Sequence, residues 1–147
     1  EQLRAQLKRL LESRKMTEQE AECIRIRDIR RFVESGLGQR MKKAAMKKHL
    51  YREQPFVIQR NASMLDDGWK NETVLVQGII DAYFMEEEEI VLVDYKTDRV
   101  RRGQEQKLID LYHVQLEDYA RALERMTGKR VKEKIIYSFT LQKEILL

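Results

Sequence analysis

Residues 77–98 read QGIIDAYFMEEEEIVLVDYKTD, and this stretch constrains the fold more than any other part of the chain. Two apolar runs flank four consecutive glutamates, a pattern that predicts an antiparallel hairpin with its turn at Glu87 and Glu88. In that register Asp81 faces Asp94 across the hairpin, and directly opposed Cβ atoms lie roughly 4.5–5.5 Å apart. A turn shifted by one residue would place the two aspartates on opposite faces of the hairpin.

Asp81 and Asp94 need a partner, because an isolated carboxylate is costly to bury in an apolar strand. Side chains alternate along a strand, so Lys96 lies on the same face as Asp94 while Tyr95 lies on the other. Two close carboxylates repel each other unless a proton or a cation intervenes, and a shared divalent cation resolves that conflict. Oxygen ligands favour Mg²⁺ or Mn²⁺ over zinc. The spacing alone leaves a purely structural ion-pair cluster as an equal alternative.

Two carboxylates, a divalent cation and a lysine are suited to phosphodiester hydrolysis. The cation activates water and stabilises charge on a phosphoryl group, and a lysine beside it steadies the attacking hydroxide or the transition state. Three arginines follow the hairpin directly, namely Arg99, Arg101 and Arg102. We expect them to contact a nucleic-acid backbone without reading its sequence.

The remaining periodicity predicts an α/β fold. Helices are expected at about 3–11, 17–33, 39–49 and 108–126, and strands at 51–59, 74–85, 90–95 and 134–140. The second helix begins at the capping box Thr17-x-x-Glu20, and the long helix ends at Gly128. Strands 74–85 and 90–95 are apolar on both faces and are expected to be covered on both sides. The lysines of 39–49, with Arg40, are expected to form a solvated helix face.

Length and composition indicate one domain over 1–147, with a helical part at 1–49 and a core at 50–147. The sequence has no apolar run that could span a membrane and no signal-peptide pattern, so a cytoplasmic location is expected. The formal net charge of +4 mildly favours a polyanionic partner. Trp69, in a polar turn at 61–71, is expected to cover the edge of the core.

Three motifs carry a resemblance to a known family: G-I-I-D at 78–81, V-D-Y-K-T-D at 93–98 and Q-L-E-D-Y at 115–119. Together they resemble the RecB-type branch of the D-(D/E)-x-K nucleases. Further matches at 34–41, 51–56 and 127–139 make the chain similar to the C-terminal nuclease domain of the AddA family of helicase–nucleases. The resemblance implies a restriction-endonuclease-like mixed central sheet flanked by helices.

The resemblance also implies roles for individual residues. Asp81 and Asp94 correspond to metal ligands, with the backbone carbonyl of Tyr95 as a candidate third ligand. Lys96 corresponds to the catalytic lysine, and Glu53 matches the first acidic position of the family. The family's upstream G-T-x-x-H segment, whose histidine is a metal ligand, does not occur in this sequence. We therefore expect the chain to be a fragment that begins after that segment.

Gln115 and Tyr119 match the Q-x-x-x-Y helix of the family. They are four residues apart and share a helix face, from which they are expected to contact DNA or brace the site.

The function that the resemblance implies is that of a Mg²⁺-dependent exonuclease, with Mn²⁺ as a substitute metal. It would hydrolyse phosphodiester bonds in single-stranded DNA, as part of an ATP-dependent helicase–nuclease that processes double-strand breaks for recombinational repair. The expected partners are an AddB-type second subunit and the helicase part of the same full-length chain. ATP would serve only that helicase part, because this sequence has no Walker motif. The alternative is a non-catalytic scaffold of nuclease fold that binds DNA or docks another protein chain.

Overall fold

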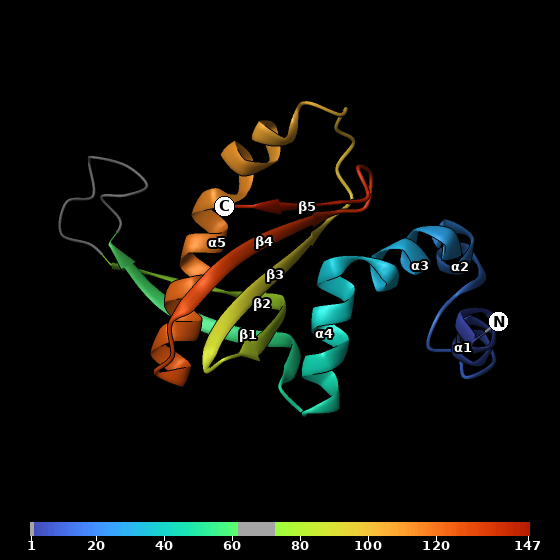
Figure 1. Cartoon of the computed structure of the whole chain (residues 1–147), viewed down its shortest axis with the longest axis horizontal. Helices are drawn as coiled ribbons and strands as arrows, with labels where there is room; N and C mark the ends of the chain where they lie inside the picture. Colours follow the sequence, from blue (N-terminus) through green and yellow to red (C-terminus); the bar gives the residue numbers. More distant parts are fainter. Residues whose placement is uncertain (1, 62–72) are drawn as a thin grey trace. The chain divides into compact units, whose positions relative to one another are not determined.

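The computed structural model describes residues 2–61 and 73–147 (Figure 1). Trp69 and the polar turn predicted around it lie outside these described residues. The chain divides into two compact units, residues 1–39 and 40–147. The expected organisation as one domain, with a boundary at 49/50, stays a prediction.

The first unit is helical, with α1 at Gln2–Glu12, α2 at Glu18–Cys23 and α3 at Ile26–Glu34. The predicted capping box is present, because the Thr17 hydroxyl accepts from the Glu20 N–H at 3.2 Å and Glu20 accepts from the Thr17 N–H at 2.8 Å. The prediction of one helix over 17–33 is wrong. Ile24 and Arg25 adopt extended backbone and separate α2 from α3, and the β-branched Ile24 and Ile26 weaken the helical preference there.

Helix α4 spans Gly36–Met46, so it begins earlier and ends earlier than the predicted helix at 39–49. The early start follows from Ser35, whose hydroxyl accepts from the Gly38 N–H at 3.1 Å as an N-cap side chain does. A Cβ at Gly38 would lie 2.1 Å from the carbonyl oxygen of Phe32. Glycine is therefore required where α3 gives way to α4.

The second unit is built on one five-stranded sheet in the order β1-β2-β3-β4-β5. The strands are β1 Leu50–Asn61, β2 Thr73–Glu86, β3 Glu89–Lys96, β4 Val131–Ser138 and β5 Lys143–Leu146. Only β3 and β4 pair in parallel, and α5 (Glu105–Thr127) connects them; the other neighbours are antiparallel. The mixed sheet confirms the predicted α/β fold class. The short strand β5 was not predicted.

Helix α5 runs along one face of the sheet (Figure 1) and encloses the main core with it. Leu116 and Leu123 of the helix are fully buried in one cluster with Ile80, Leu92 and Ile136 of the strands. The helix ends where the sequence predicts, because Gly128 has the left-handed φ of 69° that suits glycine. The core thus holds α5 next to the strands that carry the acidic motifs.

The hairpin between β2 and β3 has the predicted register. Its turn lies at Glu87 and Glu88, whose φ angles of 53° and 68° are both positive, as in a type I′ turn. The prediction that both strands are covered on both faces is wrong for the first half of β2. Leu75 and Ile79 are 69% and 58% exposed, whereas the centre of β3 is buried.

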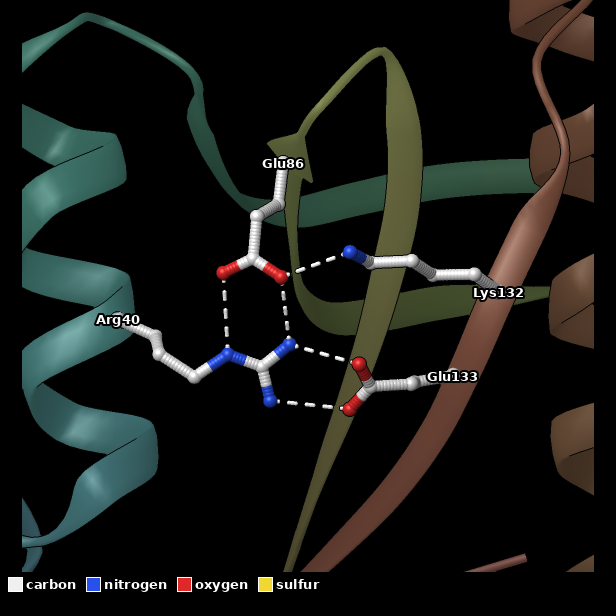
Figure 2. A network of polar contacts seen from close by, with 4 residues as sticks. All are labelled: Arg40, Glu86, Lys132 and Glu133. Carbon is white, nitrogen blue, oxygen red and sulfur yellow. Dashed lines mark hydrogen bonds and ion pairs between the residues drawn. The ribbon is translucent and has the colours of Figure 1, made fainter.

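An ion-pair network lies where α4 meets the hairpin (Figure 2). Arg40 of α4 donates to both carboxylate oxygens of Glu86, at 3.1 and 2.8 Å, and to both of Glu133, at 2.9 and 2.8 Å. Lys132 adds an ion pair to Glu86 at 2.8 Å, and the Arg40 guanidinium lies 5.5 Å from the centroid of the Phe84 ring. The expectation that Arg40 belongs to a solvated face is therefore wrong.

The neighbouring basic side chains do follow that expectation. Lys42, Lys43, Lys47 and Lys48 are all exposed, although the last two lie in the turn after α4. Within the described residues, no helix is both long enough and apolar enough to cross a lipid bilayer.

Candidate active site

The candidate site begins at an irregularity in the pairing of β1 with β2. Arg52 pairs with Ala82 and Gln54 pairs with Ile80, but the ladder skips Glu53 and Asp81 between them. Glu53 has a φ of 51°, which L-residues seldom adopt in a strand. The regular ladder is thus interrupted at the position of the first motif aspartate.

This interruption changes which face of β2 is covered by α5. Ile80 and Tyr83 both belong to the core cluster with α5, although residues three apart on a regular strand face opposite sides. Phe84 lies beneath Arg40 of α4 instead. The alternation therefore breaks between Ile80 and Tyr83, beside Asp81.

Asp81 is anchored to the neighbouring strand by its side chain. The last rung of the β2–β3 ladder joins Ala82 to Val93, and beyond it the backbone N–H of Tyr95 donates to Asp81 Oδ2 at 2.9 Å. One carboxylate oxygen of Asp81 is thereby fixed next to β3. This is the convergence of Asp81 with Asp94 and Lys96 that the hairpin register predicted.

Asp94 and Lys96 form the charged centre of the site. Asp94 is only 2% exposed, and its Oδ2 lies 2.8 Å from Lys96 Nζ as an ion pair. That contact lacks hydrogen-bond geometry, so Asp94 Oδ2 is a buried oxygen without a hydrogen bond within the described residues. Burial raises the pKa of Asp94, the Lys96 ammonium opposes this rise, and the nearby charge of Asp81 adds to it.

Helix α5 covers this charged centre from one side. The Gln115 side-chain oxygen accepts from Lys96 Nζ at 3.1 Å, and Lys96 Nζ lies 3.9 Å from the centroid of the Tyr112 ring. Burial raises the pKa of Tyr119, and the charges of Asp94 and Asp81 raise it further. Gln115 and Tyr119 therefore lie where the sequence predicts, beside the aspartates and the lysine.

Tyr95 points to the other side of the sheet, as the alternation predicts. Its hydroxyl contacts the sulfur of Met41 in α4 at 3.7 Å, and burial raises the pKa of Tyr95 to about 12. Its side chain is thus removed from the charged centre. Only its backbone can take part in the site, through the N–H that holds Asp81 and through the carbonyl.

The glycine of the G-x-x-D motif has a steric role. A Cβ at Gly78 would lie 2.9 Å from Cε1 of Phe56, whose ring packs on that position of β2. Phe56 in turn meets Tyr119 edge to face, with ring centroids 5.1 Å apart. Gly78 therefore provides the space in which Phe56 supports Tyr119.

The other predicted site residues are placed less decisively. Glu53 is exposed, and the residues at 2–61 and 73–147 contain no group of three His, Cys, Asp or Glu side chains that could hold a metal ion. Arg99, Arg101 and Arg102 are exposed, and none of them forms an ion pair with another described residue. Their roles stay predictions.

Tyr112 and Asp98 are two site residues that the sequence reasoning missed. The Tyr112 hydroxyl donates to Asp98 Oδ1 at 2.9 Å, so both lie within one contact of Lys96. A signal was available for each. Tyr112 precedes Gln115 by three residues and shares its helix face, and Asp98 is the last residue of the D-Y-K-T-D motif.

The donor set suits a hard divalent cation. Mg²⁺ is usually held by one or two carboxylates and keeps several waters or substrate phosphates in its remaining positions. Asp81, the unbonded Oδ2 of Asp94 and the carbonyl of Tyr95 supply oxygen donors of that kind. The residues present therefore fit such an ion without a third acidic side chain.

Comparison with known proteins agrees with this geometry. The family described as the PD-(D/E)XK nuclease superfamily matches residues 1–145. The chain belongs to this superfamily. Asp94-Tyr95-Lys96 thus forms the (D/E)-x-K element that gives these nucleases their name, and PD-(D/E)XK nucleases generally use divalent metal ions.

Similar proteins share one description, that of the AddA-type subunit of an ATP-dependent helicase/nuclease. The protein from Clostridium novyi is 38% identical over 99% of this chain, and that of Acetivibrio thermocellus is 43% identical over 95%. A third, from Thermoanaerobacter sp., is 41% identical over 95%. The chain spans only 11–12% of the length of these relatives. The resemblance to the nuclease part of AddA is thereby confirmed for this PD-(D/E)XK domain.

Proposed function

We propose that this chain is a Mg²⁺-dependent deoxyribonuclease domain that hydrolyses phosphodiester bonds. The observation that supports it best is the buried pair of Asp94 Oδ2 and Lys96 Nζ, 2.8 Å apart, with Asp81 fixed beside it through the Tyr95 N–H. A cluster built only for stability would not leave a buried carboxylate oxygen without a hydrogen bond, because that is costly.

Each residue has a defined part in the proposed reaction. Asp81, Asp94 and the Tyr95 carbonyl hold the metal ion, which would supply the activation of water and the charge stabilisation that phosphoryl transfer requires. Lys96 donates to the attacking water or to an oxygen of the scissile phosphate as negative charge develops there. Gln115 keeps the lysine in place, and Tyr119 braces the helix against β1.

The substrate is proposed to be single-stranded DNA. Arg99, Arg101 and Arg102 lie after the catalytic strand, where their exposed guanidinium groups are available for backbone phosphates. An open hollow of about 280 Å³ also adjoins the site, and Gln115, Tyr119 and Phe56 are among the residues that line it. A strand without a paired partner could enter such a hollow more easily than a duplex.

We extend the proposal to the longer protein because of the name its relatives carry. The domain would act as an exonuclease on strands delivered by a helicase part of the same protein, during recombinational repair of double-strand breaks in the cytoplasm. ATP would serve that helicase part, and an AddB-type chain would be the second partner. The nuclease reaction itself requires no ATP in this scheme.

Cleavage of end-labelled linear single-stranded DNA in Mg²⁺ or Mn²⁺, without ATP, tests the proposal. We expect cleavage that stops in EDTA. Closed circular single-stranded DNA tests the exonuclease assignment, because an exonuclease requires an end and should leave the circle intact. Binding of the linear strand without cleavage, under both metals, would favour the non-catalytic scaffold instead.

Two variants separate the roles of the charged residues. Asp94→Ala should abolish metal binding and cleavage together, because it removes the buried ligand. Lys96→Ala should retain metal binding in a calorimetric titration while cleavage falls by at least about 100-fold, the usual loss when one charge-stabilising donor is removed. Asp110→Ala, an exposed aspartate of α5, is the matched control and should behave as the parent does. Equal loss of metal in the Asp94 and Lys96 variants would contradict these roles.

A further inference from the structure

Three groups hold the Lys96 ammonium. It pairs with Asp94 Oδ2 at 2.8 Å, donates to Gln115 Oε1 at 3.1 Å, and lies 3.9 Å from the centroid of the Tyr112 ring. The side chain is only 14% exposed. A lysine has a flexible four-carbon stem, so its charge is localised only as well as these neighbours hold it.

Asp94 cannot serve this purpose alone if it also binds the metal of the proposed function, on which this inference rests. The oxygen that pairs with Lys96 is the same Oδ2 that has no hydrogen bond. A cation on that oxygen would compete with the ammonium for its charge. The two contacts that metal binding leaves untouched are those from α5, to Gln115 and to the Tyr112 ring.

The Tyr112 ring is itself fixed by a second contact. Its hydroxyl donates to Asp98 Oδ1 at 2.9 Å, and Asp98 follows Lys96 by two residues in the segment that leaves β3. This hydrogen bond therefore connects α5 to the chain just beyond the lysine. It holds the face of the ring against the ammonium, where the negative face of an aromatic ring attracts a cation.

We propose that Tyr112 and Asp98 are positioning residues of the nuclease site: the Tyr112 ring holds the Lys96 ammonium in place, and Asp98 holds the ring. The last aspartate of the D-Y-K-T-D motif then acts through the tyrosine and not as a metal ligand. Tyr112 touches neither the metal nor the reacting atoms in this arrangement.

The kinetic test compares the loss of the ring with the loss of its hydroxyl. Tyr112→Leu should lower kcat by about two- to thirtyfold, which corresponds to about 0.5–2 kcal/mol of cation–π attraction, with KM and the calorimetric affinity for Mg²⁺ unchanged. Tyr112→Phe keeps the ring and should lower kcat less. Leu111→Ala, at an adjacent exposed position of α5, is the control and should match the parent.

Asp98 is tested by coupling it to Tyr112. Asp98→Ala should reduce kcat in the parent chain, but should have no further effect in the Tyr112→Leu variant if it acts only through the ring. Asp98→Asn retains an acceptor oxygen and should restore most of the loss. A fall in Mg²⁺ affinity in Asp98→Asn would make Asp98 a ligand and overturn the proposal.

A measurement on the metal-free chain tests the contact without any reaction. The ring should shift the NMR signals of the Lys96 ε-methylene protons upfield, and this shift should persist in Tyr112→Phe and vanish in Tyr112→Leu. Equal kcat in Tyr112→Leu and the parent would refute the positioning role. Equal losses of kcat in the Phe and Leu variants would refute the role of the ring. If the parent does not cleave DNA, the nuclease proposal fails, and the NMR shift alone decides whether the ring holds the lysine.

Discussion

Removal of the Glu86 charge should make the stability of this chain less sensitive to acid. Hydrogen bonds from Arg40 are the main cause that lowers the pKa of Glu86, from 4.5 to about 2, with Lys132 contributing further. Because the folded-state pKa is depressed, the stabilisation is fully present above pH ~4.5. It is lost as the pH falls from there toward about 2.

The size of the effect follows from that pKa. A lowering from 4.5 to about 2 corresponds to roughly 3.4 kcal/mol at ~1.36 kcal/mol per pH unit. The Glu86 side chain is 33% exposed, so solvent screening reduces this value, and we expect about 1–2 kcal/mol. At pH 7, Glu86→Gln should therefore be less stable than the parent by that amount. At pH 3 more than half of the difference should have disappeared.

Urea unfolding followed by circular dichroism at pH 7, 5, 4 and 3 measures this difference directly. Comparison of the two proteins at each pH cancels the contributions of the other carboxylates. The same substitution in an Arg40→Met background is the control, and its effect there should be much smaller because the main partner is absent. A difference between Glu86→Gln and the parent that stays constant or grows as the pH falls would refute the reasoning.

Two further substitutions test the local structure around the site. Gly78→Ala should lower the free energy of unfolding by about 1–3 kcal/mol, because its Cβ would meet Phe56 at 2.9 Å; Phe56→Leu should relieve part of that loss, and an unchanged urea midpoint would contradict the steric argument. Replacing Glu87-Glu88 by Asn-Gly should raise the free energy of unfolding by about 1 kcal/mol, because both positions have positive φ. A lower melting temperature in that variant would show that the glutamate side chains matter more than the turn geometry.

The parts of the site that the sequence could predict are those set by local spacing. The turn at Glu87 and Glu88 determines the register, and the register brings Asp81 to Asp94. Alternation along β3 separates Lys96 from Tyr95. Gln115 could be placed only through the resemblance, because nothing in local spacing says which turn of a long helix will lie over a given strand.

The parts that could not be predicted depend on contacts between distant segments. Arg40 looks like one basic residue among several on its helix, and only the fold brings Glu86 and Glu133 to it. The break in alternation between Ile80 and Tyr83 is similarly hidden, because the residues on both sides of it are apolar. The backbone conformation of Glu53, on another strand, accompanies that break.

The interruption at Asp81 explains how an acidic site can form in the middle of a packed sheet. A carboxylate on a regular strand would have to face either the core or the opposite surface. Here the ladder with β1 omits Asp81, and the ladder with β3 gives way to a hydrogen bond from the Tyr95 N–H to the carboxylate itself. One Asp81 oxygen thus replaces a backbone acceptor, which satisfies a buried donor and fixes the orientation of the side chain. Asp94 has no such bond at Oδ2. The site therefore consists of one aspartate held by the fold and one left available for the chemistry.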